Sequence, residues 1–351
     1  MASSGSAPGR TRVLFCGNPC TATATQEVLD DSFDEATRAG IEIVACPRER
    51  VPEEAPKSDV LVSLATPLDR ALLERCPRVK VAMQHGVGVE GIDKAACTDL
   101  GIWVSNVPSQ GTDNAVGVAE LAIYLAIAAL RRHNDMAEAV RTRATAKPVG
   151  HTLAGKRVLL VGYGGCGVEV ADRLRNWKCP VSVLRNRPWT PGMDGPEIEE
   201  ITRTLHAKGT WKEDRLAFAR HADVVVLTAM AGADTAGMID AEFLAACPDG
   251  VIIVNVARGI LLDRDAIEQA IDTPKIGALA LDVYWNEPAD PTDPIVAHPK
   301  TYLTPHSGGA THTGYRDQSL GVVQVAVDVH KGLRPRIVLN APQNPRVGEP
   351  L

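Results

Sequence analysis

Short runs of apolar residues, many of them β-branched, recur along the first third of the chain and alternate with segments of helical character. The runs lie at residues 13–16, 41–45, 60–65, 79–83 and 103–105. Strand-like runs separated by helical segments are typical of crossover connections, which bring successive strands into one parallel sheet. The pattern therefore predicts a first doubly wound α/β unit.

A second series of apolar runs begins after a helical segment at residues 112–132. The runs lie at residues 157–161, 181–184, 224–228, 251–255, 278–283 and 302–304. This series predicts a second, longer doubly wound unit. A final helical segment at residues 313–331 precedes a Pro-rich stretch without periodicity, which we expect to pack back on the first unit.

The length of the chain agrees with two units. With 351 residues it exceeds the usual single domain, so two domains of roughly 150 residues each are expected. Residues 1–12 are mostly small and polar, and we expect them to form a disordered tail. Residues 187–210 contain several Pro and Gly, which predicts a long loop rather than a flap over a ligand.

Composition and charge exclude several classes of protein. Apolar residues make up 45% of the chain and charged residues 23%, which is typical of a folded globular protein. The net charge of -6 and the 14 aromatic residues argue against a nucleic-acid partner. The longest apolar stretch, residues 115–130, contains Glu120 and falls short of the roughly 20 residues of a membrane helix, so a buried helix is expected.

Eight cysteines are scattered along the chain without a Cys-x-x-Cys pair. Scattered cysteines without a secretory signal suggest a reducing compartment, and we expect a cytoplasmic protein. The first residues carry Arg10 and Arg12 and no acid, which leaves organellar import open as an alternative. His298, His306 and His312 lack cysteine or carboxylate partners at zinc-like spacing, so no metal site is predicted.

A glycine-rich loop follows the apolar run at residues 157–161 and precedes a helical segment. Its pattern is Gly-x-Gly-x-x-Gly, formed by Gly162, Gly164 and Gly167, with Gly165 and Cys166 inside it. In this context the first glycine permits a tight turn, the second lets the backbone approach a pyrophosphate, and the third allows close packing of helix on strand. The helix N-terminus then faces the anion, so we expect dinucleotide binding.

The next strand ends in Arg185, Asn186 and Arg187, where a dinucleotide-binding unit usually carries an acid for the ribose hydroxyls. No carboxylate follows until Asp194. Two guanidinium groups suit a ribose phosphate better than a diol, so NADP is favoured over NAD. The alternative is that both arginines are solvated loop charges and either cofactor binds.

Three residues late in the chain form a chemically complete set beside a hydride carrier. Arg258 lies in Asn-Val-Ala-Arg-Gly, Glu287 in Asp-Val-Tyr-Trp-Asn-Glu-Pro, and His306 in Thr-Pro-His-Ser-Gly-Gly. A guanidinium binds a carboxylate through two parallel hydrogen bonds, an imidazole passes one proton near neutral pH, and a carboxylate orients that imidazole. Together they suggest redox chemistry on a small oxo-acid.

In their order and spacing these motifs resemble the D-isomer-specific 2-hydroxyacid dehydrogenase family, which includes glyoxylate/hydroxypyruvate reductases and phosphoglycerate dehydrogenases. The match also includes residues 86–93, Gly-Val-Gly-Val-Glu-Gly-Ile-Asp, and residues 114–120, Asn-Ala-Val-Gly-Val-Ala-Glu. Intervals of 29 residues from Arg258 to Glu287 and 19 from Glu287 to His306 are similar to those of the family. The resemblance runs through most of the chain.

The resemblance implies a role for each residue of the set. Arg258 would bind the carboxylate and oxo oxygen of the substrate, His306 would donate the proton to that oxygen, and Glu287 would hold the imidazole. The backbone at Val87 and Gly88 resembles the carboxylate-binding turn of the family. Substrate binding is thus expected at Val87, Gly88, Arg258 and His306.

Cofactor contacts are also implied by the resemblance. Asp282 resembles the acid that contacts the nicotinamide carboxamide, and Thr228 and Ala257 are expected at the cofactor beside the glycine loop. The segment at residues 227–231 lacks the usual proline, which leaves the contacts of Thr228 in doubt. His85, just ahead of the Val87–Gly88 turn, is open to two interpretations, a specificity residue or a hydrogen-bond donor within the loop.

The resemblance also implies an organisation in domains. A substrate domain of flavodoxin-like type would comprise residues 13–112 and 313–351, and a Rossmann NAD(P)-binding domain residues 113–312. The apolar helix near residues 114–132 would pair with a second copy of the chain, so a homodimer is expected.

The sequence therefore favours an NAD(P)-dependent reductase that converts a small 2-oxo acid to the D-2-hydroxy acid, similar to hydroxypyruvate or glyoxylate reductases. A phosphoglycerate dehydrogenase-like enzyme is an alternative, and the 45 residues after His306 would leave no room for the regulatory domain that many such enzymes carry. A dinucleotide-sensing corepressor or scaffold with little turnover is the alternative from another class.

Overall fold

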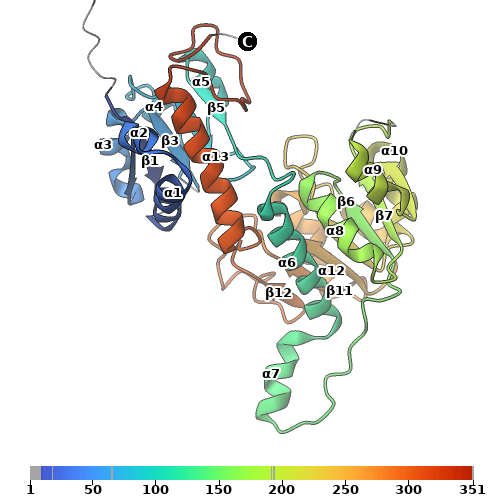
Figure 1. Cartoon of the computed structure of the whole chain (residues 1–351). Coiled ribbons are helices and arrows are strands. Elements are labelled where there is room, and N and C mark those ends of the chain that lie inside the picture. The colour runs from blue at the N-terminus through green and yellow to red at the C-terminus, as the bar shows by residue number, and fades with distance from the viewer. Residues whose placement is uncertain (1–8, 18, 65, 191, 193, 350–351) are drawn as a thin grey trace, which may run out of the picture. The chain divides into compact units, whose positions relative to one another are not determined.

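A computed structural model of the chain describes residues 9–17, 19–64, 66–190, 192 and 194–349. The chain divides into two compact units, unit 1 (Met1–Ser109 and His312–Leu351) and unit 2 (Gln110–Thr311). Each unit is built on its own parallel sheet, so the predicted fold class of two doubly wound units is confirmed (Figure 1). The units divide after Ser109 and after Thr311, and the sequence predicted boundaries after residues 112 and 312.

Unit 1 contains a five-stranded sheet in which every pairing is parallel. The strands are β1 (Thr11–Cys16), β2 (Ile41–Cys46), β3 (Val60–Ser63), β4 (Val81–Gln84) and β5 (Trp103–Ser105). Their spatial order is β2-β1-β3-β4-β5, which is the flavodoxin-like order. The carboxyl ends of all five strands therefore meet at one edge of this sheet.

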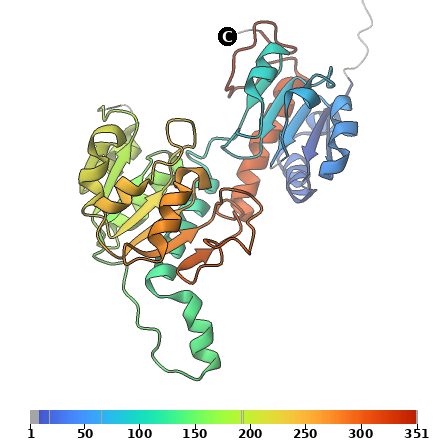
Figure 2. The ribbon, with the colours of Figure 1, turned by 180° about the vertical axis from the view of Figure 1, so that it is seen from behind.

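The helices of unit 1 cover both faces of the sheet (Figures 1 and 2). They are α1 (Pro19–Ser32), α2 (Glu35–Gly40), η1 (Arg48–Arg50), α3 (Val51–Glu54), η2 (Ala55–Lys57), α4 (Arg70–Leu73), α5 (Lys94–Asp99) and α13 (His312–His330). Side chains alternate between the faces of a strand, so Val13 and Phe15 pack with α1 and α13, and Leu14 packs with α3 to α5. Both faces are apolar, as a covered parallel sheet requires.

The C-terminal stretch after α13 packs along β5, within unit 1. The buried Trp103 indole donates a hydrogen bond from Nε1 to the Val347 carbonyl oxygen at 2.8 Å, and the Leu339 amide donates to the Val104 carbonyl oxygen at 2.8 Å. At the other end of the chain, the predicted tail of residues 1–12 is wrong in its last part, because β1 begins at Thr11. Residues 1–8 lie outside the described residues.

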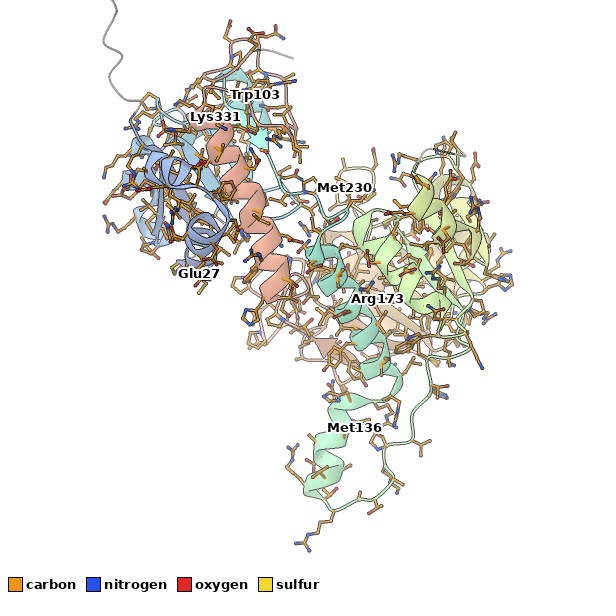
Figure 3. The ribbon with its side chains drawn as sticks, in the orientation of Figure 1. Glu27, Trp103, Met136, Arg173, Met230 and Lys331 are labelled. Carbon is orange, nitrogen blue, oxygen red and sulfur yellow. The ribbon has the colours of Figure 1, made fainter. Side chains whose placement is uncertain are left out.

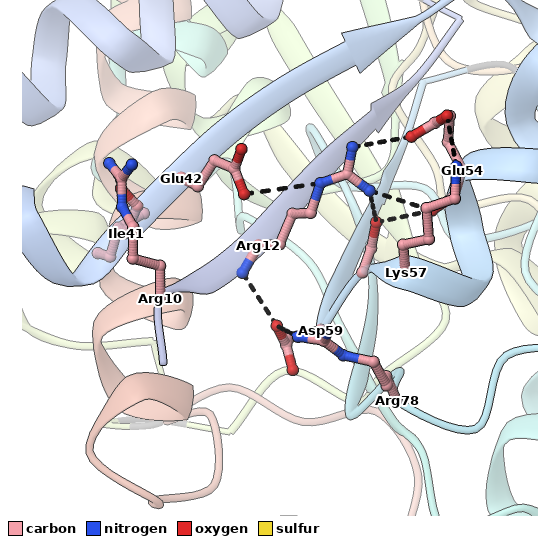
Figure 4. A network of polar contacts seen from close by, with 9 residues as sticks. Arg10, Arg12, Ile41, Glu42, Glu54, Lys57, Asp59 and Arg78 are labelled. Carbon is pink, nitrogen blue, oxygen red and sulfur yellow. Dashed lines mark hydrogen bonds and ion pairs between the residues drawn. The ribbon is translucent and has the colours of Figure 1, made fainter. Parts of the chain in front are cut away.

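Charged side chains gather at the amino-terminal edge of the unit 1 sheet, opposite the carboxyl ends (Figure 4). Arg12 donates from Nη2 to Glu54 Oε2 at 2.8 Å, and its amide donates to Asp59 Oδ2 at 3.0 Å. Hydrogen bonds from Arg12 and from Lys57 hold the pKa of Glu54 down to about 2. The network joins the start of β1 to the segment that precedes β3.

Unit 2 contains a seven-stranded sheet that is parallel throughout. The strands are β6 (Val158–Val161), β7 (Val181–Arg185), β8 (Ala207–Thr210), β9 (Val224–Leu227), β10 (Val251–Asn255), β11 (Ile276–Leu281) and β12 (Thr301–Leu303). The order β12-β11-β10-β9-β6-β7-β8 reverses direction between β6 and β9. Ligands of open α/β sheets bind at such a switch point, beyond the carboxyl ends of the strands.

The helices of unit 2 are α6 (Asp113–Leu130), α7 (His133–Arg141), α8 (Gly165–Arg175), α9 (Pro196–Arg203), α10 (Trp211–Ala219), α11 (Ala241–Ala246), η3 (Gly259–Leu261) and α12 (Arg264–Ile271). Helix α6 is long and apolar enough to cross a membrane by length and composition, and 61% of it is buried in the structure. Its buried face packs on α8 and on the sheet. Such burial is typical of a core helix.

Two parts of unit 2 differ from the predicted elements. The segment at residues 187–210 was expected to be a loop, but it contains α9 and the edge strand β8; residues 191 and 193 lie outside the described residues. Helix α7, which the pattern did not predict, has no buried residue and extends away from the sheet of its unit, with Met136 on it (Figure 3). Its apolar Val140 is 77% exposed within the described chain.

Candidate active site

The glycine loop connects β6 to α8 at the switch point of the unit 2 sheet. Gly162 adopts φ +104°, and a Cβ there would overlap the backbone of Thr228 and Ala229 after the neighbouring strand β9. A Cβ at Gly167 would overlap the Gly162 carbonyl oxygen. The first and third glycines are therefore required by the fold itself, one for the turn and one for helix packing.

The middle of the loop faces open space. A Cβ at Gly164, the N-cap residue of α8, would meet nothing within 4 Å, and Gly165 and Cys166 form the first turn of the helix. That turn carries no acidic residue, so its amide groups are suited to a pyrophosphate. Thr228 donates from Oγ1 to the Gly162 carbonyl oxygen at 3.1 Å, which places its side chain on the loop despite the unusual sequence after β9.

The two arginines after β7 have different environments. The Arg185 side chain is 4% exposed and donates to Asp194 Oδ2 at 2.6 Å and to the carbonyl oxygens of Pro188 and Arg187. Arg187 is 64% exposed and lies 3.6 Å from Asp194 Oδ1, and Asn186 is exposed beside it. Arg185 and Arg187 were predicted to bind a ribose phosphate together. In the structure only Arg187 is exposed, because the Arg185 guanidinium is buried and already hydrogen-bonded.

A short turn after β10 positions Arg258. The fully buried Asn255 side chain accepts a hydrogen bond from the Ala257 amide at 3.1 Å and donates to the Arg258 carbonyl oxygen at 2.8 Å. Next in the chain, a Cβ at Gly259 would overlap the backbone of Tyr284. The Arg258 turn is therefore packed directly on the segment that leads from β11 to Glu287.

Asp282 holds the loop that carries His306. This carboxylate, 2% exposed, accepts hydrogen bonds from the Thr304 hydroxyl at 2.7 Å, the Ser307 amide at 2.8 Å and the Gly308 amide at 2.9 Å. Charge-assisted hydrogen bonds of this kind are among the stronger ones in proteins. Asp282 was predicted at the cofactor, and the structure adds an anchoring function that the sequence did not indicate.

His306 and Glu287 form a close pair on adjacent loops of unit 2. Nδ1 of His306 lies 2.6 Å from Glu287 Oε2, and Glu287 Oε1 accepts from the Tyr284 amide at 3.1 Å. Burial raises the pKa of Glu287, but the hydrogen bond from His306, its charge, the Tyr284 amide and the charge of Arg258 together lower this pKa. Glu287 therefore stays ionised and orients the ring, with Nε2 on the opposite side.

The three predicted catalytic residues thus converge in one unit. They come from the loops after β10, β11 and β12, which are adjacent strands in the sheet. His306 has φ +53°, a left-handed backbone conformation that is rare for a residue other than glycine. The contact of Nδ1 with Glu287 Oε2 then orients the imidazole.

The Val87–Gly88 turn follows β4 at the carboxyl edge of the unit 1 sheet. Gly86 has φ +133°, and its carbonyl oxygen accepts from the Val107 amide at 2.9 Å. The Val87 carbonyl oxygen accepts from Asn106 Nδ2 at 2.6 Å. The turn is therefore fixed from the end of the neighbouring strand β5, which is what a backbone binding site requires.

His85, directly ahead of that turn, is buried with neither ring nitrogen hydrogen-bonded in the part of the chain that the structure describes. Its ring is 3% exposed and meets the rings of Phe15 and Tyr315 edge to face, each at 6.0 Å between centroids. Burial lowers the pKa of His85 to about 4, so the imidazole is neutral. The interpretation of His85 as a hydrogen-bond donor within the loop is not supported by a partner.

Residues 123–308, which are 186 of the 351 in the chain, match the sequence pattern of the D-isomer specific 2-hydroxyacid dehydrogenase, NAD binding domain. The chain belongs to this 2-hydroxyacid dehydrogenase family. The matched stretch contains the glycine loop and the three converging residues. It confirms the family resemblance on which the roles of those residues were predicted.

Individual members of the dehydrogenase family differ in what they act on. The D-3-phosphoglycerate dehydrogenase of Archaeoglobus fulgidus is 29% identical over 323 residues, covering 90% of this chain and 58% of that protein. The 4-methyl-2-oxopentanoate reductase A of Aspergillus oryzae is 30% identical over 270 residues, covering 76% of this chain and 77% of that protein. The chain spans about half the length of the phosphoglycerate dehydrogenases it matches, from 43% to 58%.

Solved structures of the family have the same fold. The crystal structure of a glyoxylate reductase from Paecilomyes thermophila is similar over 94% of this chain and 98% of that chain, with a TM-score of 0.75 and 26% identity. Within the described ranges no group of three or more His, Cys, Asp or Glu is arranged to hold a metal ion. The residues present fit a dinucleotide, since the Gly164 edge is open and the α8 N-terminus carries no acid.

Sequence reasoning missed several residues that build the site. Asn255 and Thr304 hold the Arg258 turn and the His306 loop, and Asp194 and Trp189 surround Arg185. Asn255 ends a strand directly before the Arg258 turn, which is a signal that could have identified it. Asp194 gave no such signal, because the loop that brings it back to β7 has no regular pattern.

Proposed function

We propose that this protein is an NAD(P)-dependent reductase that converts a small 2-oxo acid to the corresponding D-2-hydroxy acid. The observation that carries the proposal is the His306–Glu287 pair at 2.6 Å, with Arg258 near enough to lower the pKa of Glu287, in the same unit as the glycine loop. A proton donor, its orienting acid and a carboxylate-binding cation are what the reaction requires besides a hydride.

In the proposed reaction a 2-oxo acid, NAD(P)H and one proton give a 2-hydroxy acid and NAD(P)⁺. Bound at the glycine loop, the cofactor would supply the hydride. Arg258 binds the carboxylate and the oxo oxygen of the substrate, and His306 gives its proton from Nε2 to that oxygen as negative charge develops there. Glu287 stabilises the charged imidazole before the transfer, so both residues act mainly on the transition state.

The backbone amides at Val87 and Gly88, in unit 1, would bind the substrate carboxylate as well. Support comes from the family resemblance and from the rigid hold on this turn by Asn106. Gly162, Gly164, Gly165, Cys166 and Gly167 would bind the pyrophosphate, with Thr228, Ala257 and Asp282 beside it. The exposed guanidinium of Arg187 would contact the ribose phosphate and favour NADP. The buried Arg185 would not contact the phosphate but would hold the loop that carries Arg187.

The proposal also names a substrate for this reaction. Hydroxypyruvate or glyoxylate is our first candidate, and the relative from Aspergillus oryzae, a 4-methyl-2-oxopentanoate reductase, supports reduction of a small 2-oxo acid. A phosphorylated hydroxy acid is the alternative, because several relatives are D-3-phosphoglycerate dehydrogenases.

A homodimer and a cytoplasmic location complete the proposal. Helix α7 and the segment after it bury nothing within the described chain, and Val149 is 81% exposed there, which suits contact with a second copy. None of the eight cysteines, all of which are described, forms a disulfide, which supports a reducing compartment. Light scattering tests the first point, and a monomer at micromolar concentration contradicts it.

The decisive experiment measures turnover of a panel of 2-oxo acids, including glyoxylate, hydroxypyruvate and 4-methyl-2-oxopentanoate, with NADH and with NADPH, and of D-3-phosphoglycerate in the reverse direction. We expect His306→Gln to lower kcat by about 10³-fold. His221→Gln, an exposed histidine at the amino-terminal edge of the same sheet, is the matched control. Dinucleotide binding without turnover on the whole panel would contradict the proposal and favour a sensor.

A further inference from the structure

The corner of unit 2 beyond β7 contains a closed ion-pair arrangement that the family resemblance does not include. Asp194 lies between two guanidinium groups, with Oδ2 2.6 Å from Arg185 Nη1 and Oδ1 3.6 Å from Arg187 Nη2. Its side chain is 12% exposed. Both carboxylate oxygens therefore face cations, and neither is presented to solvent as an acceptor for ribose hydroxyls.

Arg185 is fixed on every side of its guanidinium. Nε donates to the Arg187 carbonyl oxygen at 3.1 Å and Nη2 to the Pro188 carbonyl oxygen at 2.8 Å. The guanidinium carbon lies 3.8 Å from the centroid of the Trp189 ring, a close cation–π contact. A group bonded in this way has no donor left in an exposed position for a ligand.

Trp189 connects this arrangement to the glycine loop. Its ring lies 5.3 Å from the ring of Tyr163, inside the loop, and its Nε1 donates to the Gly209 carbonyl oxygen at 2.9 Å. The Tyr163 hydroxyl in turn lies 3.1 Å from Thr202 Oγ1 on α9. The buried Arg185 thus contacts the glycine loop through Trp189 and Tyr163. Arg187, which binds the same carboxylate as Arg185, lies at the surface.

We infer that Asp194 sets how strongly this site distinguishes a 2′-phosphorylated dinucleotide from one with a free ribose diol. By binding Arg185 inside and Arg187 at the surface, Asp194 reduces three charged groups to one net positive charge. A phosphate at the ribose would meet the exposed Arg187 with a carboxylate behind it. Lys208, whose Nζ lies 5.5 Å from the centroid of the Trp189 ring, is a further cation that Asp194→Asn leaves unchanged. This inference rests on the proposed dinucleotide function and adds the residue that limits its preference.

The charge balance gives the direction of the effect. Removing the carboxylate charge raises the net charge of Arg185, Arg187 and residue 194 from one to two, which favours a phosphate dianion and leaves an uncharged diol nearly unaffected. Asp194→Asn keeps the volume and an oxygen acceptor for Arg185, so the surrounding loop retains its hydrogen bonds. Asp249→Asn is the matched control, because Asp249 pairs with Lys275 at 2.8 Å at the opposite edge of the same sheet and is 71% exposed.

The test is the affinity of the full-length protein for 2′,5′-ADP and for 5′-ADP, measured by calorimetric titration without a substrate. We expect Asp194→Asn to bind 2′,5′-ADP about tenfold more tightly and 5′-ADP within about twofold of the native protein, with the difference falling as salt is raised. Arg187→Gln should weaken 2′,5′-ADP about tenfold and spare 5′-ADP. Asp249→Asn should change neither probe.

Several results would overturn the inference. They are equal changes for the two probes in Asp194→Asn, an unchanged ratio between them, or no binding of either probe by the native protein. Because the titration needs no turnover, its outcome is separate from that of the proposed reaction. A protein that binds both probes as expected but reduces no 2-oxo acid would contradict the reaction and leave the function of Asp194 in place.

Discussion

The carboxyl edges of the two sheets are both placed where α/β units bind ligands, yet they differ in chemistry. At the edge of unit 2 the polar side chains are charged and paired, as in His306 with Glu287 at 2.6 Å and Asp282 with the loop amides. At the edge of unit 1, two neutral side chains beside the Val87–Gly88 turn have polar atoms that are unpaired within the described chain. Neither ring nitrogen of His85 has a hydrogen-bond partner among the described residues, and the same holds for Asn106 Oδ1.

In the proposed reaction, this difference would separate proton transfer in unit 2 from recognition of the substrate by unit 1. Proton transfer requires groups of defined charge in defined positions, and unit 2 supplies them through short loops on adjacent strands. Recognition of a substrate's remaining atoms needs only hydrogen-bonding capacity and shape. Unit 1 has such capacity unused beside the Val87–Gly88 turn, and it costs stability for as long as it stays unused.

The largest effect is expected from Glu287→Gln, which breaks the charged pair at the edge of unit 2. Glutamine still accepts a hydrogen bond from His306 but no longer stabilises a charged imidazole, so kcat should fall by about 10²- to 10³-fold. Steady-state kinetics with the best 2-oxo acid measures this. Glu268→Gln, an exposed residue of α12, is the control.

The pH profile sharpens the same prediction. Since the folded pKa of Glu287 is lowered, its charge is present above the ordinary carboxyl value and is lost only as pH falls through the lowered pKa. The native protein should therefore keep its activity to mildly acidic pH, and the glutamine variant should lack the acid limb that Glu287 contributes. Equal activity of Glu287→Gln and the native protein would remove the proposed orienting function.

The second effect concerns stability at the edge of unit 1. The folded pKa of His85 is about 4, against an ordinary value of 6.5, so the unfolded chain binds a proton first as pH falls. Titration of His85 leaves the free energy of unfolding unchanged above pH 6.5. As pH falls from 6.5 toward 4, this free energy decreases by on the order of 3 kcal/mol, because only the unfolded chain gains the proton. His85→Leu should remove this dependence, which urea unfolding at pH 7 and pH 4.5 measures; an unchanged pH dependence contradicts it.

A third prediction concerns the anchor of the His306 loop. Asp282→Asn retains an acceptor but loses the charge that three donors share, so we expect kcat to fall roughly tenfold and the urea midpoint to decrease. Thr304→Val removes only one of these donors and should have a smaller effect on both measurements. If both variants keep the kcat of the native protein, the hydrogen bonds of Asp282 do not position His306.

The smallest effect on activity is expected at the amino-terminal edge of unit 1, in the Arg12 network. The pKa of Glu54 is lowered to about 2, so its contribution to stability is present above the ordinary value near 4.5 and is lost as pH falls toward 2. Glu54→Gln should therefore flatten the acid limb of stability in that range. Turnover at neutral pH should stay within twofold of native, and a larger loss would show that the two edges are coupled.

Much of this architecture was predictable from the chain. The buried strands β6, β9 and β10 consist of apolar residues in runs, and the glycine loop has its own spacing, so the dinucleotide-binding unit follows from local pattern. The convergence of Arg258, Glu287 and His306 followed from their order in the family, because each lies on a loop after a strand.

Other parts were not predictable because tertiary contacts decide them. Strand β8 reads Ala-Lys-Gly-Thr and lies at the edge of the sheet, where little burial is needed and no apolar run is required. The contacts of Asp282 and Asp194 depend on loops that return to distant strands. Helix α7 places Met136, Ala139 and Val140 at helical spacing, but it is short and has no buried residue, so this brief pattern did not lead to its prediction.

The enclosure of Arg185 also has a consequence for how such a protein changes over generations. Replacing Asp194 by an apolar residue would leave the Arg185 guanidinium buried without a countercharge, at a cost of several kcal/mol. Replacing Arg185 would leave Asp194 with Arg187 at 3.6 Å as its remaining countercharge. A change of Asp194 to an apolar residue should therefore require a change at Arg185 as well, so the effects of the two positions depend on each other. Adaptation to a different cofactor would then begin at Arg187, the member that can vary without disturbing the fold.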